Sequence, residues 1–269
     1  MRINWRVLGA AGLVSVLSVS GVVVPTGISS ATAKFSGSVF GLSRAGKVTL
    51  SSVHSAAAPT QAAAAAAAIK GVLALPAASD RPFGIWSAVP AGVRLRGVRL
   101  SGTTLAVDLT ANFTQGTPWR LRQRTAQVVY TATSVAGISR VAFSINGVRV
   151  SRIGAGGPSV AAPVARSAFD SVTPAALVLN LRPGTHVTSP FVVKGVATSF
   201  EAYVHWKVVD LQGRLIARGV TQADNNVRGH FSATIRVPRP GSVHVIVGGD
   251  APKGDVDMSD PAVTPLVVQ

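Results

Sequence analysis

Side chains suited to acid–base or metal chemistry are few in this 269-residue sequence. It has five histidines and ten acidic residues, of which Glu201 is the single glutamate, and it has no cysteine. The lack of cysteine excludes disulfides, thiolate metal ligands, a cysteine nucleophile and lipoprotein-type lipid attachment. No His-Glu-x-x-His helix, Gly-x-Ser-x-Gly elbow or phosphate-binding glycine loop occurs. The sequence therefore predicts a protein that is not an enzyme and that has no cofactor.

Two metal sites can be considered, and both lack ligands. His205 and His230 fall on the outward faces of two expected strands, but no third ligand stands at a recognisable spacing. Asp255 and Asp257 suggest a calcium loop, yet the Gly and Glu that such a loop requires are missing. Glu201 has no partner carboxylate at a recognisable spacing for glycosidase chemistry. We expect surface histidines, an acidic turn and no bound metal.

The basic residues are more informative. The net charge is +16, and a charge of this size favours an anionic partner. Two groups of arginines are candidates for contact with anionic wall polymer or lipid headgroups: Arg94, Arg96 and Arg99 in an expected hairpin strand, and Arg120, Arg122 and Arg124 at the start of an expected helix. The alternative interpretation is a solvated face, because arginine is spread evenly along the chain.

The N-terminal residues predict export. Arg2 and Arg6 form a basic region, residues 7–24 are almost wholly apolar or small, and Ala31-Thr-Ala33 has the pattern of a cleavage site. Residues 1–33 are therefore predicted to be a signal peptide, with an uncleaved membrane anchor as the alternative. Either one places the remaining residues outside the cytoplasm, in the cell wall or at the membrane. The expected partners are then envelope proteins or a second copy of the chain, and not nucleic acid.

Residues 60–154 have the pattern of a small α+β domain, and residues 34–59 before it are expected to be a linker or a first strand. The expected elements are a helix starting after Thr60, a hairpin at 93–100 and 104–109, a helix at 119–134, a strand at 141–145 and a turn at Asn146-Gly147. This order predicts helices packed on one face of a sheet.

Residues 174–269 have the pattern of an all-β sandwich, after a linker at 155–173 that is rich in Ala, Pro, Gly and Ser. Val204, Trp206 and Val208 alternate with polar residues, which is typical of a strand with one buried face. The stretch from Phe231 to Val237 shows the same alternation. We expect an antiparallel sandwich with Trp206 in its core.

Motifs in the α+β region resemble the GerMN domain of sporulation and germination proteins. They are WSAVPAGV (86–93), LAVDL (105–109), RTAQVVYT (124–131) and VAFSINGV (141–148). The resemblance covers roughly residues 45–172. It implies a fold similar to the ring-building modules of sporulation machinery, and with it assembly through sheet and helix surfaces.

Motifs in the second region resemble the immunoglobulin-like domain of bacterial spore germination. They are RPGTHVTSP (182–190), VKGVATSFE (193–201) and VHWKVVD (204–210). This resemblance implies an accessory binding or spacing module with no known chemistry. Together the two resemblances imply an exported, non-enzymatic scaffold or assembly module of the cell envelope. The alternative is a binding module for an anionic cell-wall polymer or another ligand.

Overall fold

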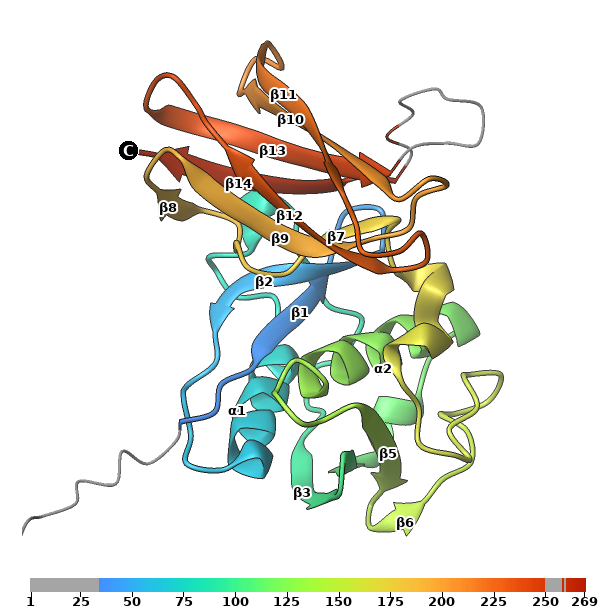
Figure 1. Cartoon of the computed structure of the whole chain (residues 1–269). Helices are drawn as coiled ribbons and strands as arrows, with labels where there is room; N and C mark the ends of the chain where they lie inside the picture. The colour runs from blue at the N-terminus through green and yellow to red at the C-terminus, as the bar shows by residue number, and fades with distance from the viewer. Residues whose placement is uncertain (1–33, 250–257, 259) are drawn as a thin grey trace, which may run out of the picture. The chain divides into compact units, whose positions relative to one another are not determined.

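The computed structural model describes residues 34–249, 258 and 260–269 (Figure 1). The predicted signal peptide and the aspartates of the considered calcium loop lie outside the described residues. Within them, no helix has the length and apolar character needed to cross a bilayer. The described residues all belong to one compact unit.

Helix α1 (Gln61–Leu73) forms where a run of alanines follows a capping residue. The Thr60 side chain accepts a hydrogen bond from the backbone N–H of Ala63 at 3.1 Å, which satisfies one of the free donors of the first turn. Small side chains let neighbouring elements approach the helix closely. Gly71, for example, lies so near Val39 that an added Cβ would be 2.8 Å from a Val39 methyl group.

A four-stranded sheet packs against the helices. Its strands are β3 (Leu95–Ser101), β4 (Thr104–Leu109), β5 (Arg140–Ile145) and β6 (Val148–Arg149), in that order. Strands β4 and β5 are parallel and are joined through helix α2 (Pro118–Ala132), after the short helix η2 (Ala111–Thr114). The predicted hairpin turn is confirmed, since Asn146 and Gly147 adopt the positive φ angles of 50° and 84° that such a turn needs.

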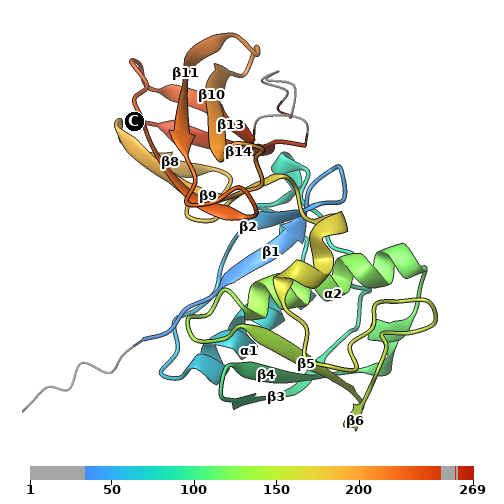
Figure 2. The same cartoon turned by 45° about the vertical axis from the view of Figure 1, so that its right-hand side comes forward.

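Residues 34–59, expected to be a linker or a first strand, contain a two-stranded sheet of β1 (Ser38–Leu42) and β2 (Val48–His54). Figures 1 and 2 show α1 and α2 lying between this sheet and the four-stranded sheet. The expected packing of the helices on one face of a sheet is found for the four-stranded sheet, and the β1–β2 sheet adds a further layer on their other side. Strand β1 covers the second side of α2. The Phe40 N–H donates to Thr131 Oγ1, and the Phe40 carbonyl accepts from Gln127 Nε2.

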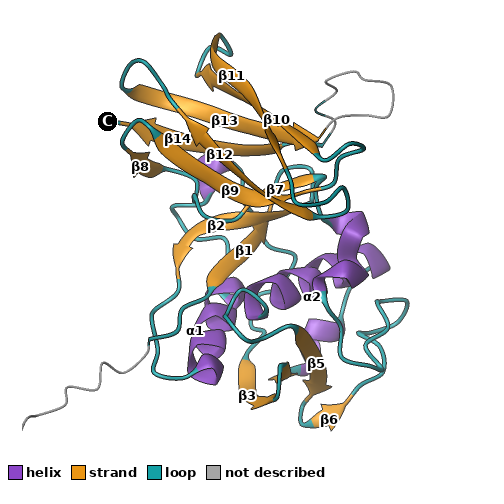
Figure 3. Ribbon diagram, in the orientation of Figure 1, coloured by secondary structure: helices purple, strands orange, loops and turns teal. Residues whose placement is uncertain are grey.

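The C-terminal region is a sandwich of two sheets, and Figure 3 shows its strands and loops. The strands are β7 (Ala176–Val178), β8 (Thr185–Val187), β9 (Phe191–Ala197), β10 (Tyr203–Asp210), β11 (Leu215–Gln222), β12 (Gly229–Ile235), β13 (Gly241–Gly249) and β14 (Ala262–Val268). One sheet has the order β11-β10-β13-β14-β8 and the other β12-β9-β7. The predicted fold class, an α+β domain followed by an immunoglobulin-like sandwich, is confirmed.

The predicted strand faces of the sandwich are also found. Val204 and Val208 are fully buried, and the residues of β12 alternate between buried and exposed from end to end. Trp206 shares the inward face but is only partly buried. Its ring packs over Gly219, its cross-strand partner on β11. Valines, and not the tryptophan, thus fill the centre of the core.

The expected linker at 155–173 ends in a short helix, η3 (Arg166–Val172), and another short helix, η1 (Arg81–Phe83), follows α1. Phe169 and Val172 of η3 are fully buried in the hydrophobic cluster of the α+β region. The boundary that we place in this segment stays a prediction.

We expect Trp206→Ala to lower the free energy of unfolding by about 2–3 kcal/mol. This is below the ~3–5 kcal/mol for a fully buried aromatic, because part of the ring is exposed. Lys207→Ala, on the opposite face of β10, is the control and should cost under about 1 kcal/mol. Chemical denaturation measures both. Equal losses would mean that the strand is shifted by one residue, which exchanges its faces.

Candidate functional site

The first group of predicted arginines is exposed on the hairpin. Arg94 precedes β3, and Arg96 and Arg99 lie within it. In a regular strand, residues three positions apart face opposite sides. The register of β3 shifts between Leu95 and Gly97, and this bulge brings Arg96 and Arg99 to the same side. Arg96 Nε forms an ion pair there with Asp108 Oδ2 at 3.0 Å.

Two further arginines share this side of the sheet. Arg99 pairs with Ala106, and Ala106 pairs with Ala142 on β5. Arg140 lies two residues before Ala142, and Arg149 of β6 pairs with Ser144, two residues after it. Residues that alternate by two or pair directly across strands lie on one face.

We call this surface the outer sheet face. It is defined by Arg96, Arg99, Arg140, Arg149 and Asp108. Asp108 is the one carboxylate in the four strands. The sequence prediction missed Arg140 and Arg149 because they are far from the hairpin along the chain. Arg140 begins the expected strand region and Arg149 follows the Asn-Gly turn, but only the register places them on the same face as Arg99.

The second group of predicted arginines does not form one surface. Consecutive helix residues are about 100° apart, so positions i and i+2 point in nearly opposite directions. Arg120 is exposed, with its guanidinium 4.4 Å from the centre of the Trp86 ring. Arg122 turns to η3, where Nε donates to Ser171 Oγ and Nη2 to the Ala168 carbonyl, both at 2.7 Å. The expectation of a shared contact surface is wrong for this group.

Arg124 is an internal residue and only 4% exposed. Its Nη1 donates to the carbonyls of Phe113 at 2.9 Å and Gln115 at 2.6 Å, which closes the loop after η2. Burial lowers the pKa of the Arg124 guanidinium, and the positive charge of Arg120 lowers it further. Arg124 therefore has a structural role and is unavailable to an external anion.

The histidines and acidic residues form no catalytic arrangement in the part of the chain that the structure describes. His205 and His230 lie on strands of different sheets. The Asp224 carboxylate accepts from the backbone N–H of His230, which lowers the pKa of Asp224, and it also pairs with the His230 ring at 3.2 Å. Among the described residues, no three His, Asp or Glu side chains gather to hold a metal ion. Glu201 is exposed.

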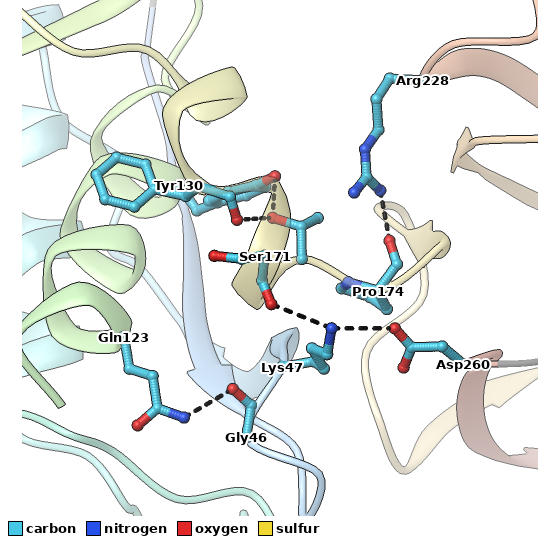
Figure 4. A network of polar contacts seen from close by, with 10 residues as sticks. Gly46, Lys47, Gln123, Tyr130, Ser171, Pro174, Arg228 and Asp260 are labelled. Carbon is cyan, nitrogen blue, oxygen red and sulfur yellow. Dashed lines mark hydrogen bonds and ion pairs between the residues drawn. The ribbon is translucent and has the colours of Figure 1, made fainter. Parts of the chain in front are cut away.

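A polar network links the β1–β2 turn, η3 and the sandwich (Figure 4). Lys47 Nζ pairs with Asp260 Oδ2 at 3.3 Å and donates to the Ser171 carbonyl at 3.1 Å. The Tyr130 hydroxyl, whose pKa is raised by burial, is 2.8 Å from Thr173 Oγ1.

The network continues at both ends (Figure 4). Arg228 donates to the Pro174 carbonyl, and Gln123 Nε2 donates to the Gly46 carbonyl at 2.9 Å. Ser171 and Thr173 at the end of the expected linker, and Pro174 just after it, are thus bonded on several sides.

We expect Arg124→Ala to lower the free energy of unfolding by about 2–4 kcal/mol, because it leaves two carbonyls without their donor and removes the packed side-chain stem. The matched control is Arg120→Ala, one turn away on the surface, which should cost at most about 1 kcal/mol. Thermal or urea unfolding measures both. A loss for Arg124→Ala no greater than for the control would contradict the internal role.

Comparison with known proteins agrees with both resemblances. Residues 31–151 match the family model described as "Sporulation and spore germination". Residues 178–255 match the model described as "Immunoglobulin-like domain of bacterial spore germination". Among the curated proteins, none matches the chain.

Two solved structures are similar to the chain. The tandem GerMN domains of the sporulation protein GerM from Bacillus subtilis share 15% identity over 87% of this chain, with a TM-score of 0.43. The chain spans 60% of the length of that structure. The first GerMN domain of the same protein shares 19% identity over 49% of this chain and 98% of its own length, with a TM-score of 0.41. The two family models, in chain order, identify a sporulation and spore germination (GerMN-type) domain followed by an immunoglobulin-like domain of bacterial spore germination.

Proposed function

We propose that the protein is a non-enzymatic, exported scaffold or assembly module of the cell envelope, and that it contacts anionic wall polymer through the outer sheet face. Both matched families are named for sporulation and spore germination, and neither description names a catalytic activity. The predicted signal peptide supports a location outside the cytoplasm. There the partners are envelope proteins, wall polymers and lipid headgroups.

The observation that carries the wall contact is the charge on the outer sheet face. Four arginines face one carboxylate, and Arg96 already neutralises that carboxylate. A guanidinium matches phosphate and carboxylate groups with two parallel hydrogen bonds, which suits a polymer that repeats such groups. Ala106, which is partly exposed beside Arg99, adds no large side chain to this face, whereas Ala142 is buried.

The overall charge of the protein also favours binding to an anionic polymer. If residues 1–33 are removed, Arg2 and Arg6 are lost and the net charge is 16 − 2 = +14. A field of this size raises the rate of encounter with any polyanion. The overall charge does not determine where the polymer binds, because arginines are also exposed on the sandwich. The test must therefore separate the outer sheet face from the total charge.

We expect residues 34–269 to co-sediment with isolated cell wall at low salt, and the affinity to fall steeply towards physiological salt because exposed charges are screened beyond about 8–10 Å. The triple variant Arg94→Ala, Arg96→Ala, Arg99→Ala removes two arginines of the outer sheet face and the exposed Arg94 just before β3. It should bind at least tenfold more weakly with an unchanged unfolding midpoint. The matched control removes three exposed arginines of the sandwich: Arg218→Ala, Arg236→Ala, Arg239→Ala. It should keep most of the affinity.

Three results would contradict the proposal. Equal losses in the two triple variants would assign binding to net charge and not to the outer sheet face. Binding that salt does not change would indicate recognition by shape, as expected of a protein partner. A peptidoglycan hydrolase activity that Glu201→Gln abolishes would rule out the non-enzymatic role.

A further inference from the structure

A cavity of about 600 Å³ lies beside the polar network of Figure 4. Its walls come from the β1–β2 turn and β2, from η1, from residues 174–183 and from residues 260–265, together with His244 of β13. The cavity has the size of pockets that bind small molecules in proteins, and it is partly open to solvent. It is separate from the outer sheet face, since the two share no residue.

The walls of the cavity are mainly apolar. Leu50, Ile85 and Leu177 are buried at the cavity, and Phe83 and Leu181 are partly exposed in it. An apolar wall that remains accessible favours a ligand with an apolar body, because covering that surface removes it from water.

The charged side chains of the cavity are Arg44, Lys47 and Asp260. Lys47 and Asp260 neutralise each other in an ion pair of 3.3 Å. Arg44 lies against Gly84, whose added Cβ would be 2.3 Å from Arg44 Nε. Arg44 is exposed and has no hydrogen bond or ion pair with any residue that the structure describes. It is therefore the free cation among the described residues that line the cavity.

The strand edge beside the cavity does not favour a peptide. Strand β14 pairs with β13 along its whole length, but with β8 only from Leu266 to Val268. The edge before Leu266 could in principle accept an added strand. Pro261 and Pro265 remove backbone donors from this stretch, and the Pro265 carbonyl already accepts from the Gly184 N–H at 2.8 Å. A small molecule fits the cavity better than an extended chain.

We propose that this cavity binds an amphiphilic anion, a molecule with an apolar body and one phosphate or carboxylate head, and that Arg44 contacts the head. Leu50, Phe83, Leu177 and Leu181 cover the body. Because the cavity is lined by residues of both the α+β region and the sandwich, the ligand stabilises the junction that Lys47 and Asp260 also link. This role is independent of wall binding.

Calorimetric titration of residues 34–269 with decyl phosphate, decanoate, decanol and inorganic phosphate, each below its micelle concentration, tests the proposal. We expect decyl phosphate or decanoate to bind and to raise the unfolding midpoint, since a ligand that binds only the folded state stabilises it. Decanol should bind at least tenfold more weakly, and inorganic phosphate should give no measurable binding. The two anions distinguish a phosphate head from a carboxylate head.

Two pairs of variants locate the binding. Val263 lines the cavity and is 50% exposed, so Val263→Trp should fill the cavity and abolish binding without unfolding the sandwich. Val220→Trp is the matched control, because Val220 is 54% exposed on β11 and lies outside the cavity. Arg44→Ala should weaken the binding of the anion at least tenfold and leave decanol unaffected. Arg218→Ala should change neither.

The proposal is overturned if neither anion binds, or if decanol binds as tightly as the anions. It is also overturned if Val263→Trp, shown by circular dichroism to be folded, binds as the unaltered protein does. An Arg44→Ala variant with full affinity for the anion would remove the assigned head contact. Each of these results can occur while the outer sheet face still binds wall polymer, so the two proposals fail separately.

Discussion

The burial of helix α2 on nearly all sides is the constraint on which the α+β region depends. From Gln123 to Ala132 each residue is buried, although several of them are polar. A buried polar group is costly unless it has a hydrogen-bond partner. Gln127 meets this requirement with the Ala88 N–H and the Phe40 carbonyl, and Thr131 with the Phe40 N–H. The helix thereby sets the positions of the segments that surround it.

The same constraint reaches the junction with the sandwich. Gln123 holds the Gly46 carbonyl in the β1–β2 turn, and Tyr130 contacts Thr173 after η3. The next residue along the turn is Lys47, whose ion pair with Asp260 reaches the strand region of the sandwich. A chain of hydrogen bonds thus runs from the centre of α2 to the edge of the cavity. These hydrogen bonds hold the walls of the cavity in place, because the β1–β2 turn and residues 174–183 are both connected to α2 through them.

Features that depend on neighbouring residues could be predicted from the sequence, whereas features that depend on contacts between distant segments could not. The Asn146-Gly147 turn and the alternation in β12 are local, and both predictions are confirmed. The packing of the β1–β2 sheet on α2 could not be predicted from local sequence. The residues on that side of the helix are polar and resemble those of a solvent-exposed face. For the same reason Arg124 was assigned to the surface. The cavity could not be predicted at all, because its lining comes from segments up to about two hundred residues apart.

The outer sheet face shows how a small irregularity decides whether a group of charges can act together. Arg96 and Arg99 would lie on opposite faces of a regular strand, and one of them would then point at the buried residues of α1. The shift at Leu95–Gly97 prevents this and increases the local twist of the edge strand. Gly97 has open space around its Cβ position, so the bulge is not required by packing against a neighbour. Its structural consequence is the placement of Arg96 beside Asp108 and on the same face as Arg99. An edge strand with charged side chains and a bulge is also protected against pairing with another strand. The bulge therefore has two structural consequences. It places two arginines on one face of the sheet, and it makes the edge of β3 a poor site for the addition of another strand.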